Sequence, residues 1–127
     1  MAKDELDALT ALTKARALIV DPEHWTRSAP GRRWKAPQRR EPGAWLPCAA
    51  TEPSASRWCA AGALCAVAGV RRDPPGIGLL QAAAQRLLGT DIGRANDDPR
   101  FSHADVLRCY DLAISLAGET GTARRAS

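Results

Sequence analysis

A stretch of small and apolar residues runs from Trp58 to Val70, between Arg57 and Arg71, with no charge inside it. A helix of this length spans about 20 Å, whereas a helix that crosses a bilayer needs about 20 apolar residues. Because a helix that is apolar on every side must be covered by other elements, the pattern predicts the central core helix of a small domain. Ser54 or Ser56 is a suitable N-cap for it.

Amphipathic patterns on both sides of this stretch predict the helices that cover it. Residues 4–20 place one broad apolar face on a helix, formed by Leu9, Leu12, Ala15, Leu18 and Ile19, with Leu6 at its border. Asp21-Pro22 ends that helix, and Asp21 caps a short turn through Trp25. Residues 77–88 form the next apolar face, which Gly89 terminates.

The last helix is expected from Ser102 to Gly118, where Asp105 occupies the third helical position and completes a capping box. Between it and the preceding helix, residues 90–101 read as a polar connection that contains Asn96-Asp97-Asp98-Pro99. Residues 119–127 read as a flexible tail.

Residues 26–53 carry five prolines and two glycines, and no helical or alternating pattern continues through them. They predict a long irregular basic loop, with a short strand pair around residues 33–35 and 44–46 as its only regular part. The expected fold is therefore mainly α: a single domain over residues 1–118, with about four helices packed around the central apolar helix.

The composition restricts the class of protein but does not indicate a function. The chain has 127 residues and a net charge of +4, and fifteen of its eighteen basic residues are Arg, a bias that GC-rich genomes also produce. Residues 1–5 are charged and lack the apolar core of a signal peptide, and no segment is a membrane span. The four cysteines, three of them in apolar helical stretches, read as free thiols in a reducing cytoplasm.

The order of several short motifs resembles a group of small uncharacterised bacterial and phage proteins, described only as a domain of unknown function. The motifs are a Trp-containing turn at residues 17–25, the Cys-x-x-Gly-Ala-Leu run at residues 59–64, the pair Asn96-Asp97 and the closing residues 102–114. The resemblance covers roughly residues 10–118, and the central loop departs from it, as does Ala95, where an aromatic residue often precedes the Asn-Asp pair. It implies a compact helical domain and no particular activity.

One candidate for chemistry is Cys59 with His103 and Asn96 or Asp97, the residue types of a thiol hydrolase. With Ser56 as the cap, Cys59 falls in the first helical turn, where the helix dipole lowers the pKa of a thiol. The alternative is that Cys59 is a small core residue and His103 an exposed one, and this alternative is favoured, because four cysteines and two histidines produce such combinations by chance. No catalytic residue is therefore assigned.

No metal site or cofactor is expected. Cys48, Cys59, Cys65 and Cys109 include no Cys-x-x-Cys pair, which structural zinc sites usually show. The Asn96-Asp97-Asp98 run lacks the ligand spacing of an EF-hand, and turn chemistry before Pro99 explains it.

The remaining candidate is a basic run interleaved with tryptophans, in which Arg can contact phosphates and Trp can stack on bases. Arg27 and Trp25 begin it, and the candidate binding residues are Arg32, Arg33, Trp34, Lys35, Arg39, Arg40 and Trp45. A solvated loop has the same composition. The preferred interpretation is a small non-enzymatic binding or regulatory module, associated with a phage or mobile element, that uses this loop to contact a protein or nucleic acid. The alternative is a Cys-dependent hydrolase, and the oligomeric state stays open.

Overall fold

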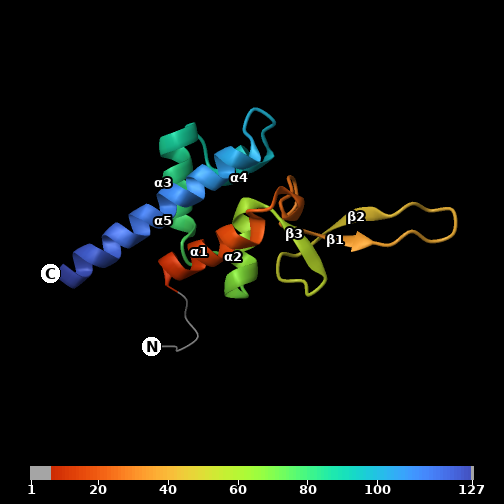
Figure 1. Ribbon diagram of the computed structural model, residues 1–127, viewed down its shortest axis with the longest axis horizontal. Helices are drawn as coiled ribbons and strands as arrows, with labels where there is room; N and C mark the ends of the chain where they lie inside the picture. The colour runs from red at the N-terminus through yellow and green to blue at the C-terminus, as the bar shows by residue number, and fades with distance from the viewer. Residues whose placement is uncertain (1–6, 127) are drawn as a thin grey trace.

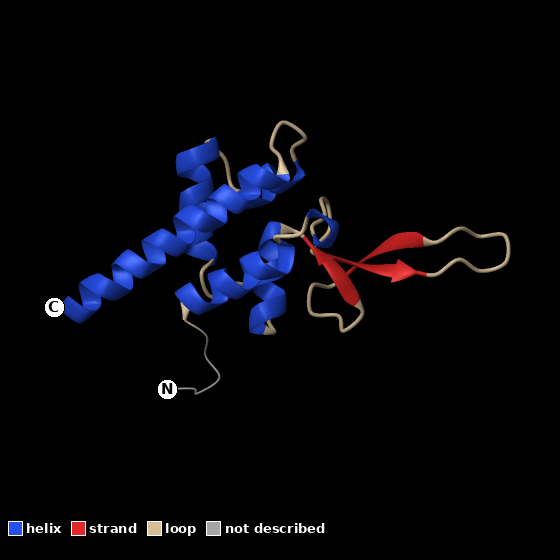
Figure 2. Ribbon diagram, in the orientation of Figure 1, coloured by secondary structure: helices blue, strands red, loops and turns tan. Residues whose placement is uncertain are grey.

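The computed structural model describes residues 7–126, with side chains through Glu119, and combines a helical body with a small antiparallel sheet (Figures 1 and 2). The elements in chain order are α1 (Ala8–Ile19), the 3₁₀ turn η1 (Pro22–His24), β1 (Gly31–Lys35), β2 (Ala44–Cys48), β3 (Ala55–Trp58), α2 (Ala60–Ala68), α3 (Ile77–Leu88), α4 (Ile92–Asp97) and α5 (His103–Ala126). The strand order is β2-β1-β3, and both pairings are antiparallel.

The expectation of a mainly α fold with an irregular central loop is wrong, because residues 31–58 form this three-stranded sheet. Most prolines of the segment lie where strands end: Pro30 precedes β1, and Pro37 and Pro42 lie in the connection to β2. Pro47 lies within β2, which is an edge strand and tolerates the missing N–H. The suggested strand pair is present, with Trp34 opposite Trp45 and Arg33 opposite Leu46.

The central helix is shorter than expected because β3 takes up its first residues. Trp58 pairs with Gly31 in the sheet, and its carbonyl accepts a hydrogen bond from the amide of Thr26 at 3.0 Å. The helix α2 therefore begins at Ala60 with Cys59 as its N-cap, so neither Ser54 nor Ser56 caps it. It ends at Gly69, whose φ of 69° is the left-handed conformation that glycine adopts without strain.

The flanking helices follow the sequence more closely. Asp7 caps α1, and the expected start at Asp4 lies outside the described residues. Asp21 caps η1, Gly89 ends α3, and Ser102 and Asp105 bond each other's amides in the expected capping box. Gly118 does not end α5, which continues to Ala126.

The polar connection of residues 90–101 contains a helix that the pattern did not predict. Asp91 caps this helix, α4, and Ile92 and Ala95 are fully buried. Six residues are too few to show a helical period, and Gly93 weakens the propensity further.

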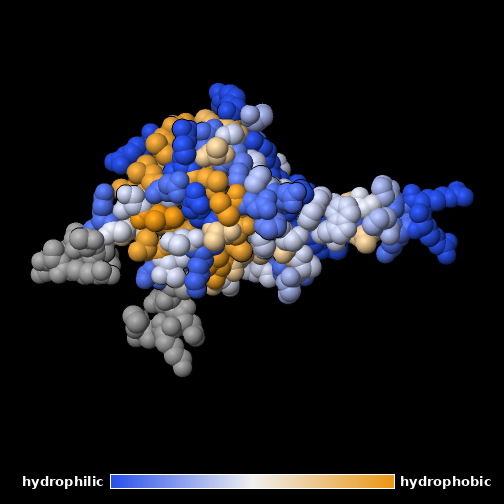
Figure 3. Space-filling model, viewed as in Figure 1, coloured by the Kyte–Doolittle hydropathy of each residue, from blue (hydrophilic) through white to orange (hydrophobic). Residues whose placement is uncertain are grey.

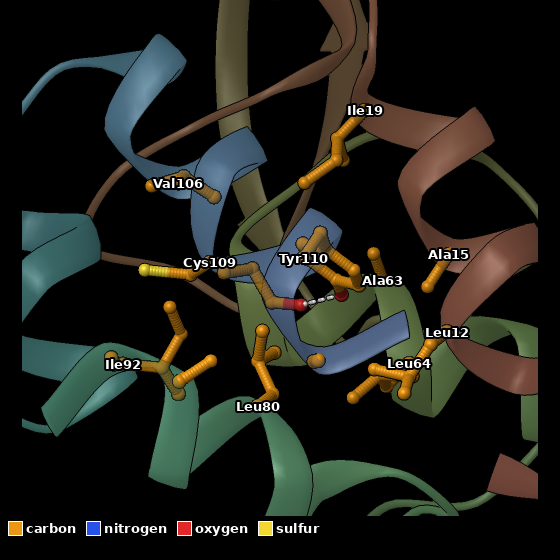
Figure 4. Close-up of a cluster of buried hydrophobic side chains, with 14 of the residues drawn as sticks. Leu12, Ala15, Ile19, Ala63, Leu64, Leu80, Ile92, Val106, Cys109 and Tyr110 are labelled. Carbon is orange, nitrogen blue, oxygen red and sulfur yellow. Dashed lines mark hydrogen bonds between the residues drawn. The ribbon is translucent and has the colours of Figure 1, made fainter. Parts of the chain in front are cut away.

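The hydrophobic core lies between the helices, with α1 packed on α2 and α3 packed on α5 (Figure 4). Tyr110 of α5 is the largest fully buried side chain, and its hydroxyl donates to the carbonyl oxygen of Ala60 at 2.6 Å. Leu12, Leu64 and Leu80 bring α1, α2 and α3 to the same cluster. None of the helices within residues 7–126 is both long and apolar enough to cross a membrane.

Candidate functional site

The hairpin arm, defined here as residues 31–48 (β1, β2 and their connection), projects from the helical body (Figures 1 and 2). Figure 3 shows apolar surface gathered over the body and strongly hydrophilic side chains at the end of the arm. The arm carries five basic residues and one acid, Glu41. It contains all seven predicted binding residues, but the structure gives them different surroundings.

Arg32 belongs to the base of the arm and is committed to structure. Its Nε donates to Thr26 Oγ1 at 2.8 Å, and its Nη2 donates to the carbonyl oxygen of Arg27 at 3.2 Å. Arg27 in turn donates to three carbonyl oxygens, those of Asn96, Asp98 and Phe101, at 2.6–2.9 Å. These two arginines tie the arm to α4 and the loop after it, so their charges are not free for a partner.

Arg33, Arg39 and Arg40 are exposed and free of such bonds. Within residues 7–119, no carboxylate pairs with any of the three. Lys35 does have a partner, Glu41, at 3.5 Å, but both side chains are well exposed and such a pair contributes little. The available positive charge of the arm therefore lies on β1 and at the tip.

Trp34 and Trp45 contact each other across the hairpin, with ring centroids 5.3 Å apart and ring planes at 57°. Trp34 is 50 % exposed, which is unusual for so large an apolar side chain. Trp45 is half-buried, and the guanidinium of Arg57 from β3 lies 3.9 Å from its ring centroid.

A buried cluster lies where the sheet joins the helical body. It consists of Asn96 and its hydrogen-bond partners Trp25, Thr26, Ala60 and Asp97, and is called the Asn96 cluster below. The Oδ1 atom of Asn96 accepts from Trp25 Nε1 at 2.7 Å and from the amide of Ala60 at 2.9 Å. Its Nδ2 donates to the carbonyl oxygen of Thr26 and to Asp97 Oδ1, both at 3.0 Å. Asn96 is 1 % exposed, and both polar atoms of its side chain form hydrogen bonds within the protein.

Cys59, Asn96 and Asp97, three of the four alternative catalytic residues, line one groove of about 370 Å³ beside α2. His103 is not among the lining residues: its Nε2 lies 2.6 Å from the carbonyl oxygen of Ile19, and its ring packs on Trp25 with centroids 5.2 Å apart. Burial raises the pKa of the Cys59 thiol, outweighing the amide hydrogen bonds of Gly62 and Ala61, which lower it. The Sγ atom accepts the Gly62 amide at 3.2 Å as the cap of α2. This environment favours a structural thiol over a nucleophile.

Metal ligands do not gather either. In the part of the chain that the structure describes, no three His, Cys, Asp or Glu side chains converge where they could hold an ion. All four cysteines are free thiols, and burial raises the pKa of each.

A family model described as a family of unknown function, DUF6197, matches residues 4–116. The chain belongs to DUF6197. No curated protein and no solved structure matches it significantly. In this DUF6197 protein three of the four landmarks of the resemblance, the Trp25 turn, the start of α2 and the Asn96-Asp97 pair, meet in the Asn96 cluster. These hydrogen bonds give the three landmarks a structural role.

Arg57 of β3 and Gly43 of the arm also shape the surroundings of the two tryptophans. The sequence pattern places Arg57 as the charge that bounds an apolar helix, whereas the structure places it in β3, over the ring of Trp45. The sequence pattern places Gly43 in an irregular loop, whereas in the structure a Cβ at this position would lie 2.2 Å from Cζ2 of Trp34. In the sequence, the one feature that could indicate this contact is a glycine placed to face an aromatic residue across a hairpin.

Proposed function

We propose that this DUF6197 protein is a non-enzymatic module that binds nucleic acid through the hairpin arm. The observation that carries the proposal is the division of the basic residues. Arg27 and Arg32 hold the arm in place, while Arg33, Arg39 and Arg40 are exposed and have no carboxylate partner among residues 7–119. Phosphates supply the charge that such arginines bind, and contacts of this kind dominate nucleic-acid affinity. We expect a cytoplasmic protein, where nucleic acid and reduced thiols coexist.

A protein partner is the competing interpretation, and the structure supports it less. An arm of this kind could add a strand from another protein along the free edge of β2. Pro47 lies in that strand and has no N–H to donate, a feature that protects edge strands from such pairing. An acidic protein surface could still contact the tip.

The test is a salt titration of binding to single-stranded DNA, duplex DNA and RNA. The variant Arg33→Ser, Arg39→Ser, Arg40→Ser should bind more weakly, with a log–log salt slope smaller by roughly 2 to 3, at about 0.7 to 0.9 per lost phosphate contact. Arg32 is kept, because its replacement would release the base of the arm.

The matched control is Arg71→Ser, Arg72→Ser, Arg86→Ser, which removes the same charge from exposed positions outside the arm. It should retain most of the affinity and the full slope. Equal losses in the two triple variants would show that net charge alone is responsible, and no binding at low salt would refute the proposal.

A further inference from the structure

Trp34 is held in a fixed position on the hairpin arm although half of its surface is exposed. A Cβ on Gly43 would lie 2.2 Å from Cζ2 and 2.5 Å from Cη2 of Trp34, so the six-membered ring of the indole lies directly against the backbone of Gly43. Trp45 contacts it from the neighbouring strand. The ring is therefore supported on one side, and 50 % of the side chain remains open to solvent.

The support continues behind Trp45. Trp34 of β1 lies opposite Trp45 of β2, whereas Arg57 of β3 lies opposite Arg32, two positions before Trp34. Because residues i and i+2 of a strand share a face, all three side chains lie on the same face of the sheet. Arg57 lies over the ring of Trp45, and no described residue accepts a hydrogen bond from its buried Nε. The cation is thus held by the ring, and the three side chains form a series that leaves Trp34 as the outermost member.

We infer that Trp34 is a stacking platform for an unpaired base, so that the arm takes single-stranded nucleic acid in preference to duplex. This inference rests on the proposed function. An indole that is fixed on one side and open on the other matches the flat face of a base, and base–aromatic stacking is the usual source of affinity for single strands. In a duplex both faces of each internal base are already covered by its neighbours, so only the two end pairs offer a face to the platform.

The charges of the arm fit the same ligand. Arg39 and Arg40 are exposed at the tip, where they can contact the phosphates that flank a stacked base. Every base has a π-face, so the platform predicts little sequence preference. Nothing in the series distinguishes a ribose from a deoxyribose, and DNA and RNA strands should bind alike.

The experiment compares three ligands of equal length at one salt concentration: a single strand, the same strand in a duplex, and an abasic strand that keeps the phosphates but has no bases. We expect wild-type protein to bind the single strand at least tenfold more tightly than either of the others. Trp34→Ala should weaken binding to the single strand about tenfold or more and leave binding to the abasic strand unchanged. Trp34→Phe, which keeps an aromatic face, should retain most of the affinity.

The salt slope separates this inference from the proposed function. Trp34→Ala removes no charge, so its slope should equal that of the wild type, whereas the triple Arg variant lowers the slope. Equal affinity for duplex and single strand, or equal losses on the intact and abasic strands for Trp34→Ala, would overturn the stacking platform and leave nucleic-acid binding intact. Absence of binding to all three ligands would overturn both and leave a protein partner for the arm.

Discussion

The indole N–H of Trp25 donates to Asn96 Oδ1 at 2.7 Å, joining residues that lie 71 positions apart in the chain. The same oxygen accepts the amide of Ala60, the first residue of α2. One buried side chain therefore fixes the turn after α1, the start of α2 and the end of α4 relative to each other.

We predict that Asn96→Ala destabilises the protein strongly. The substitution leaves the Trp25 indole N–H, the Ala60 amide and the Thr26 carbonyl without their partner in a buried site. At about 1 to 3 kcal/mol for each unsatisfied group, and allowing for relaxation, the loss should be about 3 kcal/mol or more. Chemical denaturation followed by circular dichroism measures it.

The matched control for this change is the neighbouring Asp97→Asn. Asp97 Oδ1 accepts the Ser28 amide at 2.7 Å and Asn96 Nδ2 at 3.0 Å, and an amide oxygen can accept both bonds. This variant should lose about 1 kcal/mol or less. Similar losses in the two variants would contradict the central role assigned to Asn96.

Gly62 provides a second prediction, on close approach. A Cβ at this position would lie 2.0 Å from the carbonyl oxygen of Pro30, so Gly62→Ala must displace either α2 or the chain entering β1. We expect a loss of about 2 kcal/mol despite the gain in helix propensity of about 1 kcal/mol. Gly78→Ala in α3 is the control: nothing lies within 4 Å of its Cβ, so thermal denaturation should show equal or higher stability.

Gly62 also illustrates how much of the packing can be predicted from the sequence. Because glycine lowers helix stability, its place in an apolar helix predicts that a neighbouring helix approaches closely. The close neighbour is instead the backbone of Pro30. Amphipathic stripes located α1, α3 and α5 because each helix is long enough to repeat its pattern. The strands could not be predicted so directly. β1 reads Gly-Arg-Arg-Trp-Lys, and its polar and apolar residues do not alternate, because the charged Arg32 lies on the same face as Trp34.

The sequence predicts the candidate binding residues as a group, but it does not distinguish those with a structural role from those that are exposed. Arg32 and Arg33 are adjacent and identical in chemistry, yet one bonds Thr26 and the other is exposed. Pleating sends neighbours to opposite faces, and a bulge between these two residues in the pairing with β3 alters the register. Only the three-dimensional pairing decides which of them faces the body.

Cys59 should react slowly with thiol probes at neutral pH. Burial raises the pKa of its thiol, so the thiolate that reacts is scarce until the pH approaches or exceeds the ordinary thiol value of about 8.5. Peptide mapping after alkylation should show a rate that increases throughout the range from about pH 6 to 9, and rapid labelling once the protein is unfolded. A rate that reaches a plateau below about pH 7 would instead revive the Cys-dependent hydrolase.

Tyr110 gives a prediction at alkaline pH that a single side chain reports, because it is the only tyrosine in the chain. Burial raises its pKa well above the ordinary value of about 10, so the folded protein binds this proton more tightly than the unfolded chain does. The resulting stability is fully present below about pH 10 and is lost as the pH increases above that value. Tyrosinate absorbance should therefore appear together with unfolding and not before it.

Tyr110→Phe loses the hydrogen bond to Ala60, about 1 kcal/mol at neutral pH, but has no hydroxyl to ionise and so does not lose stability by this route at alkaline pH. Its deficit in urea denaturation should shrink between roughly pH 8 and pH 11, while the buried thiols act equally on both proteins. Tyrosinate formation near pH 10 with the helices intact would contradict the buried position of Tyr110 in the core.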